Sequence, residues 1–323
     1  MWRKGTNSII AALLALVMCG CAQSANSQDD PASPISVSGD AQAARLLTSA
    51  ESPAVASPIF AAAPTDGEPF VRSQPRGVAP FPVVLNRTVQ KYVNNYVAQP
   101  QGLRESFRRS SPYMAEMVKV LEDQGLPPDL VYLAFAESGF SDDGDGPWQL
   151  SRATARRFGL EIDGWVDERR DPIKSTRAAA EYLATLHDRA NNDWRTALVA
   201  WNNGDACIDH YVRLRSASYE KLMSRLPHRT RALMNRFMAV AIMAHHASDY
   251  GLDDVSVQQA PHYRLVTVHG GVPLARIAAA SHISVASLKQ ANPALLRDRI
   301  PPGDQTYQIR LPDDELQAEL SEF

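Results

Sequence analysis

The residue best suited for chemistry in this 323-residue chain is Glu137. It ends an apolar stripe in which Leu130, Leu133, Ala134 and Glu137 recur at the spacing of one helical face. Burial disfavours the charged form of a carboxyl group and raises its pKa, so that the group can donate a proton near neutral pH. The pattern therefore indicates a general acid; the alternative is a glutamate that only pairs with an arginine at a helix end.

A buried helix has to carry this glutamate. Residues 127–129 (Pro-Pro-Asp) are typical of a helix start, and Gly139 is typical of the residue that ends one. Upstream, the pattern predicts a short helix over Leu103–Phe107 and a separate helix that starts at Ser111-Pro112. Because residues 84–251 show almost no alternation of period two, we predict an all-α domain over this range.

The remaining helices of this domain are predicted from apolar periodicity and end signals. The first has an inward face of two valines and two tyrosines, and the third starts with Asp171-Pro172. The predicted helices cover residues 89–96, 151–159, 171–186, 194–201 and 227–248.

The composition changes after Gly251, and a small separate module of β-α-α-β order is predicted over residues 261–312. A linker (residues 252–260) precedes it and an acidic tail (residues 313–323) follows it. The predicted elements are a strand over Tyr263–Val268, helices over Pro273–Ala280 and Ser284–Ala291, and a strand over Thr306–Leu311.

The N-terminus resembles that of a bacterial lipoprotein. A basic start and a short apolar core precede Met18-Cys19-Gly20-Cys21-Ala22, which is similar to a lipobox; the core is too short to span a bilayer. The resemblance implies cleavage of residues 1–21 behind Gly20, lipidation of Cys21 and, because Ala22 is not acidic, the periplasmic face of the outer membrane. The alternative is ordinary signal-peptide cleavage. Residues 22–83, rich in Ala, Ser and Pro, are predicted to be a disordered tether.

Several motifs in order resemble the membrane-bound lytic murein transglycosylase D group, whose catalytic domain is of the soluble-lytic-transglycosylase, goose-lysozyme type. The C-terminal unit resembles a degenerate LysM module, although Gly271 occupies the position where the usual acidic residue would follow the first glycine. The motifs are Glu137-Ser138-Gly139-Phe140, Gly146-Pro147-Trp148-Gln149-Leu150, Asp171-Pro172, Tyr182-Leu183, Ala200-Trp201-Asn202-Asn203-Gly204 and, in the module, residues 266–274, 277–278 and 288–293.

The resemblance implies a lysozyme-like fold and a carbon–oxygen lyase that cleaves the bond between N-acetylmuramic acid and N-acetylglucosamine in peptidoglycan. Glu137 would act first as acid and then as base while the sugar's 6-hydroxyl attacks C1, giving 1,6-anhydro ends. No second carboxylate of the kind that two-carboxylate glycosidases need is evident, because Asp142, Asp143 and Asp145 belong to a polar loop and are interpreted as solvated.

The resemblance also assigns substrate-binding positions. Ser138 and Gln149 would hydrogen-bond the saccharide, Trp148 and Tyr182 would help form the cleft, and Asn202 would lie at its floor. The alternatives are structural: a helix-end cap for Ser138, core positions for the two aromatic residues and a helix C-terminus for Asn202.

Two departures from the family pattern open a second reading. Trp201, which we also count among the substrate-binding positions, replaces the family's tyrosine, and an indole can donate but not accept a hydrogen bond. The loop between Phe140 and Trp148 is shorter than usual. The alternative function is therefore a catalytically impaired lipoprotein that binds peptidoglycan and acts as a scaffold.

Other partners are not indicated. A formal net charge of −3 argues against nucleic-acid binding. No cofactor or metal is expected, since the adjacent His245 and His246 would point about 100° apart on a helix and cannot both face one ion. The expected partners are peptidoglycan strands and, through the lipid, a membrane; the sequence identifies no protein partner.

Overall fold

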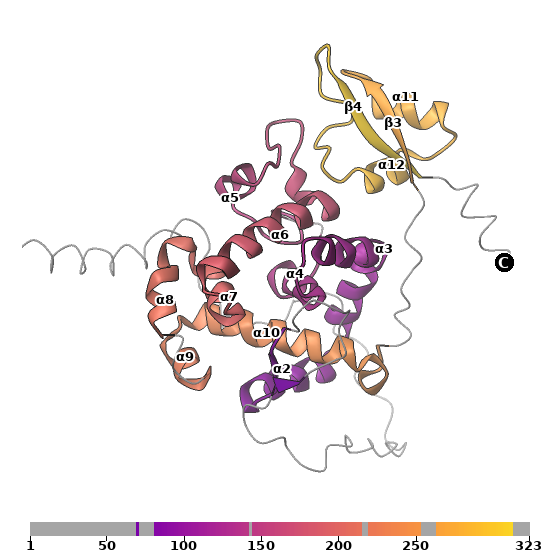
Figure 1. The fold of residues 1–323 in the computed structure, drawn as a ribbon. Helices are drawn as coiled ribbons and strands as arrows, with labels where there is room; N and C mark the ends of the chain where they lie inside the picture. The colour runs from indigo at the N-terminus through magenta and orange to yellow at the C-terminus, as the bar shows by residue number, and fades with distance from the viewer. Residues whose placement is uncertain (1–68, 71–80, 142–143, 215–218, 253–262, 313–323) are drawn as a thin grey trace, which may run out of the picture. The chain divides into compact units, whose positions relative to one another are not determined.

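The computed structural model describes residues 69–70, 81–141, 144–214, 219–252 and 263–312 (Figure 1). The predicted signal sequence, Cys21, nearly all of the tether, and the acidic tail lie outside these residues. Within the described part, no helix combines the length and the apolar character needed to cross a bilayer.

Residues 83–250 form a helical domain, which confirms the predicted fold class. A short antiparallel pair, β1 (Pro69–Phe70) with β2 (Val83–Val84), precedes it. The helices are α2 (Arg87–Ala98), α3 (Gln101–Asp123), α4 (Val131–Ser138), α5 (Arg152–Arg157), α6 (Pro172–Arg189), α7 (Trp194–Asn203), α8 (Ile208–Leu214), α9 (Tyr219–Arg225) and α10 (His228–His245).

The core of this domain is built around α10. This helix contacts α2, α4 and α7 and crosses the domain in Figure 1. Leu233, Phe237 and Ala241 of α10 are at most 1% exposed, and Phe81 packs edge-on against Phe237 with ring centroids 4.9 Å apart. Burial of such side chains is the main stabilising contribution to the domain.

The prediction of two helices before Gly125 is wrong, because α3 continues without a break through Pro112. A proline inside a helix removes one backbone hydrogen bond and usually ends or kinks the helix. Here Leu103, Ser110, Met117 and Leu121 are buried at near-helical spacing on both sides of the proline. Packing of this common face against the core therefore outweighs the local cost of Pro112.

The predicted helix starts at Ser151 and Asp171 are confirmed. The Ser151 hydroxyl accepts a hydrogen bond from the Thr154 N–H, and the Asp171 carboxylate accepts from the N–H groups of Ile173 and Lys174, both at 3.0 Å. Such caps satisfy N–H groups that have no partner within the helix. The short helices α8 and α9 were not predicted.

The C-terminal module has the predicted β-α-α-β order. Strands β3 (Tyr263–His269) and β4 (Thr306–Pro312) pair antiparallel, with α11 (Leu274–Ala280) and α12 (Val285–Ala291) between them in sequence. Gly271 has a φ of +77° and donates its N–H to the carbonyl groups of Ile300 and Pro301. Since L-residues rarely adopt this backbone conformation, it explains why glycine stands where the family pattern has an acidic side chain. The core of the module consists of Leu274, Ile277, Ala278, Leu288, Ile300, Ile309 and Leu311.

A buried hydrogen bond joins the Trp148 loop to α6. The indole Nε1 of Trp148, a residue 1% exposed, donates to the hydroxyl of the fully buried Thr176 at 2.9 Å. A buried indole N–H without an acceptor would pay its full desolvation cost.

We therefore expect Thr176→Val, which keeps the shape and removes the acceptor, to lower the free energy of unfolding by about 1–3 kcal/mol. Thr185→Val is the matched control on the same helix, because the exposed Thr185 hydroxyl only bonds back to Glu181 O. Equal denaturation midpoints for the two variants in urea would contradict the prediction.

Candidate active site

Glu137 lies in the last turn of α4, a helix that positions its carboxyl group at the edge of the core. A 3₁₀ turn, Pro128–Leu130, leads into α4, and Gly139 ends it in the left-handed conformation with φ of +59°. The four residues before Glu137 are at most 5% exposed, whereas Glu137 itself is half-buried. The sequence pattern therefore predicted correctly that an apolar helix ends in this carboxyl group.

Arg109 of α3 fixes the end of α4. Its guanidinium donates to the carbonyl oxygens of Gly139 (Nη2, 2.8 Å) and Phe140 (Nε, 2.6 Å). Carbonyl groups at a helix C-terminus have no partner within the helix, and a cation is favoured there by the helix dipole. Arg109 lies about thirty positions from its acceptors and has no motif signal, so sequence reasoning missed it.

The Glu137 carboxyl is held by Trp201 of α7. The indole Nε1 donates to Glu137 Oε1 at 2.8 Å. Burial raises the pKa of the Glu137 carboxyl; the Trp201 hydrogen bond and the nearby positive charges of Arg236 and Arg229 act in the opposite direction, and burial prevails. The result is a carboxyl that keeps its proton to higher pH than an exposed glutamate.

A pocket of about 400 Å³ opens beside Glu137. Its walls come from α2, α3, α4 and α10, and they combine polar side chains with an apolar floor of Leu103, Phe135 and Val240. Among the described residues that line it, Glu137 is the only carboxylate. The polar lining residues are Asn95, Tyr96, Gln99, Ser106, Ser138 and Arg236.

The α2 side chains in this wall correct one sequence interpretation. Val89 and Val93 are buried in the core as predicted, but Tyr96, assigned to the same inward face, lines the pocket. Burial raises the pKa of its hydroxyl, so that the group remains a neutral donor and acceptor. The two cations near Glu137, Arg229 and Arg236, were also missed, because α10 approaches α4 only in the folded chain.

Ser138 has a local structural contact in addition to a position in the pocket wall. Its hydroxyl lies 2.9 Å from Pro147 O and accepts a hydrogen bond from the Phe140 N–H at 3.0 Å. It therefore ties the end of α4 to the Gly146–Leu150 loop.

Trp148 and Tyr182 both support Trp201 from behind. Trp148 is 1% exposed and meets Trp201 edge-on at 6.0 Å, and Tyr182 is 6% exposed with its ring 5.2 Å from that of Trp201. Burial, with the charge of Asp205 adding to it, raises the pKa of Tyr182 to about 12. Neither side chain lines the pocket beside Glu137.

Gln149 and Asn202 also lie outside the pocket wall. Gln149 is exposed, has a φ of +49°, and its amide donates to Gly146 O at 2.8 Å. Asn202 Oδ1 lies 2.8 Å from the hydroxyl of the buried Thr230, which joins the end of α7 to the start of α10.

The loop before Gln149 is held by Arg169, which is only 3% exposed. Its guanidinium pairs with Asp145 and Asp167, each at 2.7 Å, and donates to Leu150 O at 3.0 Å. The interpretation of Asp145 as a solvated turn residue is therefore wrong. Gly146, with φ of +78°, lies so close to Arg169 O that a Cβ would come within 1.8 Å of it, so only glycine fits there.

No metal site is evident in the described ranges, where no three His, Cys, Asp or Glu side chains cluster. His245 and Asp129 contact each other at 2.7 Å, both nearly buried, and this pair joins α10 to the turn before α4.

Two family models match this chain. Residues 119–224 match the model described as the transglycosylase SLT domain. The chain carries an SLT domain. Residues 262–318 match the LysM-like domain of lytic transglycosylase MltD, so the resemblance inferred from the motifs is confirmed for both parts.

Curated relatives match over different lengths. Membrane-bound lytic murein transglycosylase D of Escherichia coli (strain K12) is 25% identical over 291 residues, which cover 87% of this chain and 62% of the relative; the protein of the same name from strain O6:H1 gives the same values. The chain thus spans less than two thirds of these relatives. A putative tributyltin chloride resistance protein of Alteromonas sp. (strain M-1) is 37% identical over 106 residues, 31% of this chain and 51% of that protein.

We expect Trp201→Phe to raise the pKa of Glu137 further. The indole N–H stabilises the carboxylate form, so its loss shifts the equilibrium towards the protonated acid. A ¹³C NMR titration of the Glu137 carboxyl carbon measures this shift. Trp194→Phe, on the same helix but stacked on His187, is the matched control and should leave the titration unchanged. A lowered pKa in Trp201→Phe would contradict the assigned hydrogen bond.

Proposed function

We propose that the protein is a lytic transglycosylase that cleaves the glycan strands of peptidoglycan. The single observation that carries the proposal is Glu137: a half-buried carboxyl with a raised pKa, and the only carboxylate among the described residues that line its pocket. Two-carboxylate glycosidases need a second acidic group for the nucleophile or the base. The SLT match and the likeness to the curated transglycosylases support the same substrate class.

The mechanism follows from one carboxyl group that acts twice. Protonated Glu137 donates its proton to the glycosidic oxygen as the C1–O bond breaks. The resulting carboxylate then removes the proton of the muramic acid 6-hydroxyl, whose oxygen bonds to C1. The products are a 1,6-anhydro end and a free 4-hydroxyl, and Glu137 regains its proton, so no water is consumed.

Trp201 determines which carboxyl oxygen carries that proton. An indole N–H donates and cannot accept, so Oε1, which receives it at 2.8 Å, remains an acceptor in both protonation states. The acidic proton therefore resides on Oε2. Trp201 in this way replaces the orienting role that the resemblance gives to a tyrosine hydroxyl.

The neighbouring cations would favour the second half of the reaction. Arg236 and Arg229 stabilise the carboxylate that forms when Glu137 has given up its proton. We further propose that Ser138 contacts the saccharide, since its side chain lines the pocket. Trp148 and Tyr182 would act on the cleft through Trp201, and Gln149 and Asn202 would contact the substrate only beyond the pocket beside Glu137.

One observation favours the alternative, a peptidoglycan-binding scaffold. Gln149 and Asn202 do not line the pocket with Glu137, and Gln149 is folded onto its own loop. The LysM-like domain would suit a binding role as well as an enzymatic one.

Digestion of purified sacculi by the full chain in detergent distinguishes these functions. We expect Glu137→Gln, which keeps the shape and removes the proton, to lower the rate of muropeptide release by about 10²–10⁴-fold. Mass spectrometry should show anhydro ends in the products of the parent chain.

Glu181→Gln, an exposed glutamate on α6, is the matched control and should leave the rate unchanged. Reducing ends in place of anhydro ends would replace the mechanism with hydrolysis. Absence of release from the parent chain, together with retained binding to sacculi, would leave the scaffold as the function.

We also propose that the protein is held at the periplasmic face of the outer membrane by a lipid on Cys21, with residues 22–83 as tether before the SLT-containing domain (residues 84–251). Residues 252–260 would then link this domain to the LysM-like module (residues 261–312). The lipobox-like residues 18–22 support the anchor, and the name of the curated relatives describes them as membrane-bound.

Metabolic labelling with a clickable fatty acid tests the anchor. The parent chain should incorporate the label and sediment with outer membranes, whereas Cys21→Ser should do neither. Cys19→Ser is the matched control and should be labelled like the parent. Equal labelling of the parent and Cys21→Ser would exclude Cys21 as the lipidated residue.

A further inference from the structure

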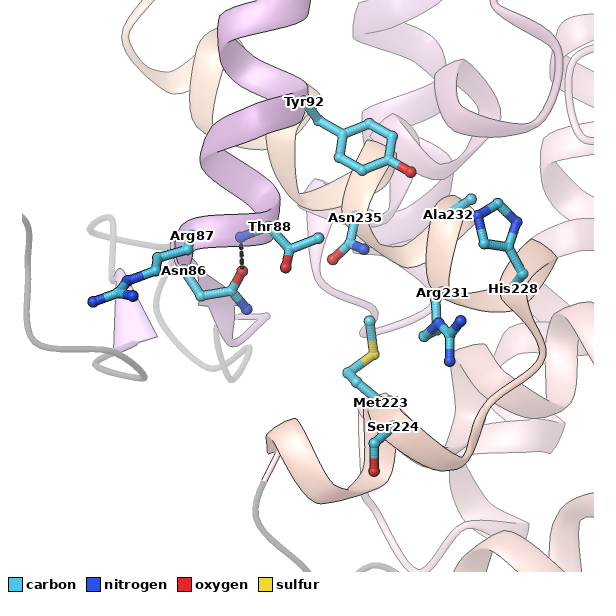
Figure 2. Close-up of a pocket in the computed structure, with 10 residues that line it drawn as sticks. All are labelled: Asn86, Arg87, Thr88, Tyr92, Met223, Ser224, His228, Arg231, Ala232 and Asn235. Atoms are coloured by element: carbon cyan, nitrogen blue, oxygen red, sulfur yellow. Dashed lines mark hydrogen bonds between the residues drawn. The ribbon is translucent and has the colours of Figure 1, made fainter. Parts of the chain in front are cut away.

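A second pocket lies between α2, α9 and α10 and has no part in the chemistry described above. Its volume is about 440 Å³. Figure 2 shows Tyr92 from α2, Met223 and Ser224 from α9, and side chains of α10 around it, while Arg87 extends away from the others. The remaining lining residues are Asn86, Thr88, His228, Arg231, Ala232 and Asn235.

A buried amide in this pocket has an unsatisfied acceptor. Asn235 is 4% exposed, and its Oδ1 is buried with no hydrogen-bond partner in the described part of the chain. Leaving such an atom unpaired costs about 1–3 kcal/mol, and native proteins rarely do so without a functional reason. A ligand with an N–H or O–H donor would satisfy it.

The other polar groups of the pocket favour negative charge. Arg231 lines it and uses Nη1 for a hydrogen bond to Leu226 O at 3.1 Å. The 18-residue helix α10 starts at His228 without a side-chain cap, so its first N–H groups add positive potential. None of the ten described residues that line the pocket is acidic.

This pocket continues into the one that contains Glu137. On α2, Thr88 and Tyr92 line the second pocket, and Asn95, Tyr96 and Gln99 line the first, all along one face of the helix. On α10 the two linings meet at the consecutive residues Asn235 and Arg236. From Val240 to His228 the helix rises about 18 Å. One extended ligand can therefore occupy both pockets.

We propose that the pocket between α2, α9 and α10 binds the carboxylate-bearing peptide of a peptidoglycan strand whose glycan lies beside Glu137. This proposal rests on the proposed function and adds a specificity site to it. A peptide supplies both a carboxylate for Arg231 and the start of α10, and amide N–H groups for Asn235 Oδ1. A bare glycan offers hydroxyl donors without the charge, and inorganic phosphate offers the charge without amide donors. Peptide-bearing strands are therefore the preferred substrate.

Two measurements on the full chain in detergent test the pocket. The first is kcat/KM on purified glycan strands that carry peptides and on the same strands after an amidase has removed them. The second is direct calorimetric binding of the released peptides, of these peptides with their carboxyl groups amidated, and of inorganic phosphate.

Two substitutions probe the pocket, and one matched control does not touch it. Arg231→Gln keeps a donor for Leu226 O and removes the charge, and Asn235→Leu removes the buried amide. Arg225→Gln, an exposed arginine at the end of α9 outside the pocket, makes the same change in net charge.

We expect the parent and Arg225→Gln to prefer peptide-bearing strands. In Arg231→Gln and Asn235→Leu the ratio of kcat/KM for peptide-bearing over peptide-free strands should fall about tenfold, the loss of one charge-assisted or buried hydrogen bond. Affinity for the free peptides should fall in parallel, and amidated peptides should bind the parent more weakly.

Three outcomes would overturn the proposal. One is equal kcat/KM on both strand types in the parent, another is an equal loss on both strand types in the two pocket variants, and the third is binding of phosphate without binding of peptide. If the parent cleaves neither strand type, the proposed function fails, and the calorimetric comparison of parent, Arg231→Gln and Arg225→Gln still decides whether the pocket binds peptides.

Discussion

The hydrogen bond from Trp201 to Glu137 connects the two helices on which the site depends. It ties α7 to the last turn of α4, and Trp148 and Tyr182 hold the indole in place from the core side. The Trp148 loop is in turn fixed through Thr176 on α6 and through Arg169. The position of a single carboxyl group thus depends on a buried aromatic layer that draws on three helices and a loop.

Burial and positive charge act on Glu137 in opposite directions. Burial favours the protonated acid, and the indole together with Arg236 and Arg229 favours the carboxylate. A group that has to give up a proton and then take one back needs neither form to be strongly preferred. The opposing influences come from different elements, the core around α4 on one side and α7 and α10 on the other.

Local patterns in the sequence predicted what local interactions determine. The apolar stripe ending at Glu137, the caps at Ser151 and Asp171 and the β-α-α-β order of the last module follow from periodicity and end signals. Pro112 misled, because packing of α3 on both sides of it outweighed a local rule.

The missing parts of the site are contacts between distant segments. Arg109, Arg236 and the α2 side chains reach the end of α4 only through the packing of α3, α10 and α2, and Asp145 finds Arg169 across a turn of the chain. Residue types and spacing carry no signal for such pairs. The resemblance to a family pointed to Gln149 and Asn202, yet the folded chain surrounds Glu137 with other polar groups.

The grip of Arg109 on the carbonyl groups of Gly139 and Phe140 has an evolutionary consequence. The end of α4 is anchored by a helix that precedes it, so the segment that follows Phe140 is not required to hold Glu137 in position. Insertions and deletions in that segment can then accumulate without displacing the carboxyl group. The short loop of this chain is one such length variant, and the same independence would let longer loops be grafted there to alter which strands are accepted.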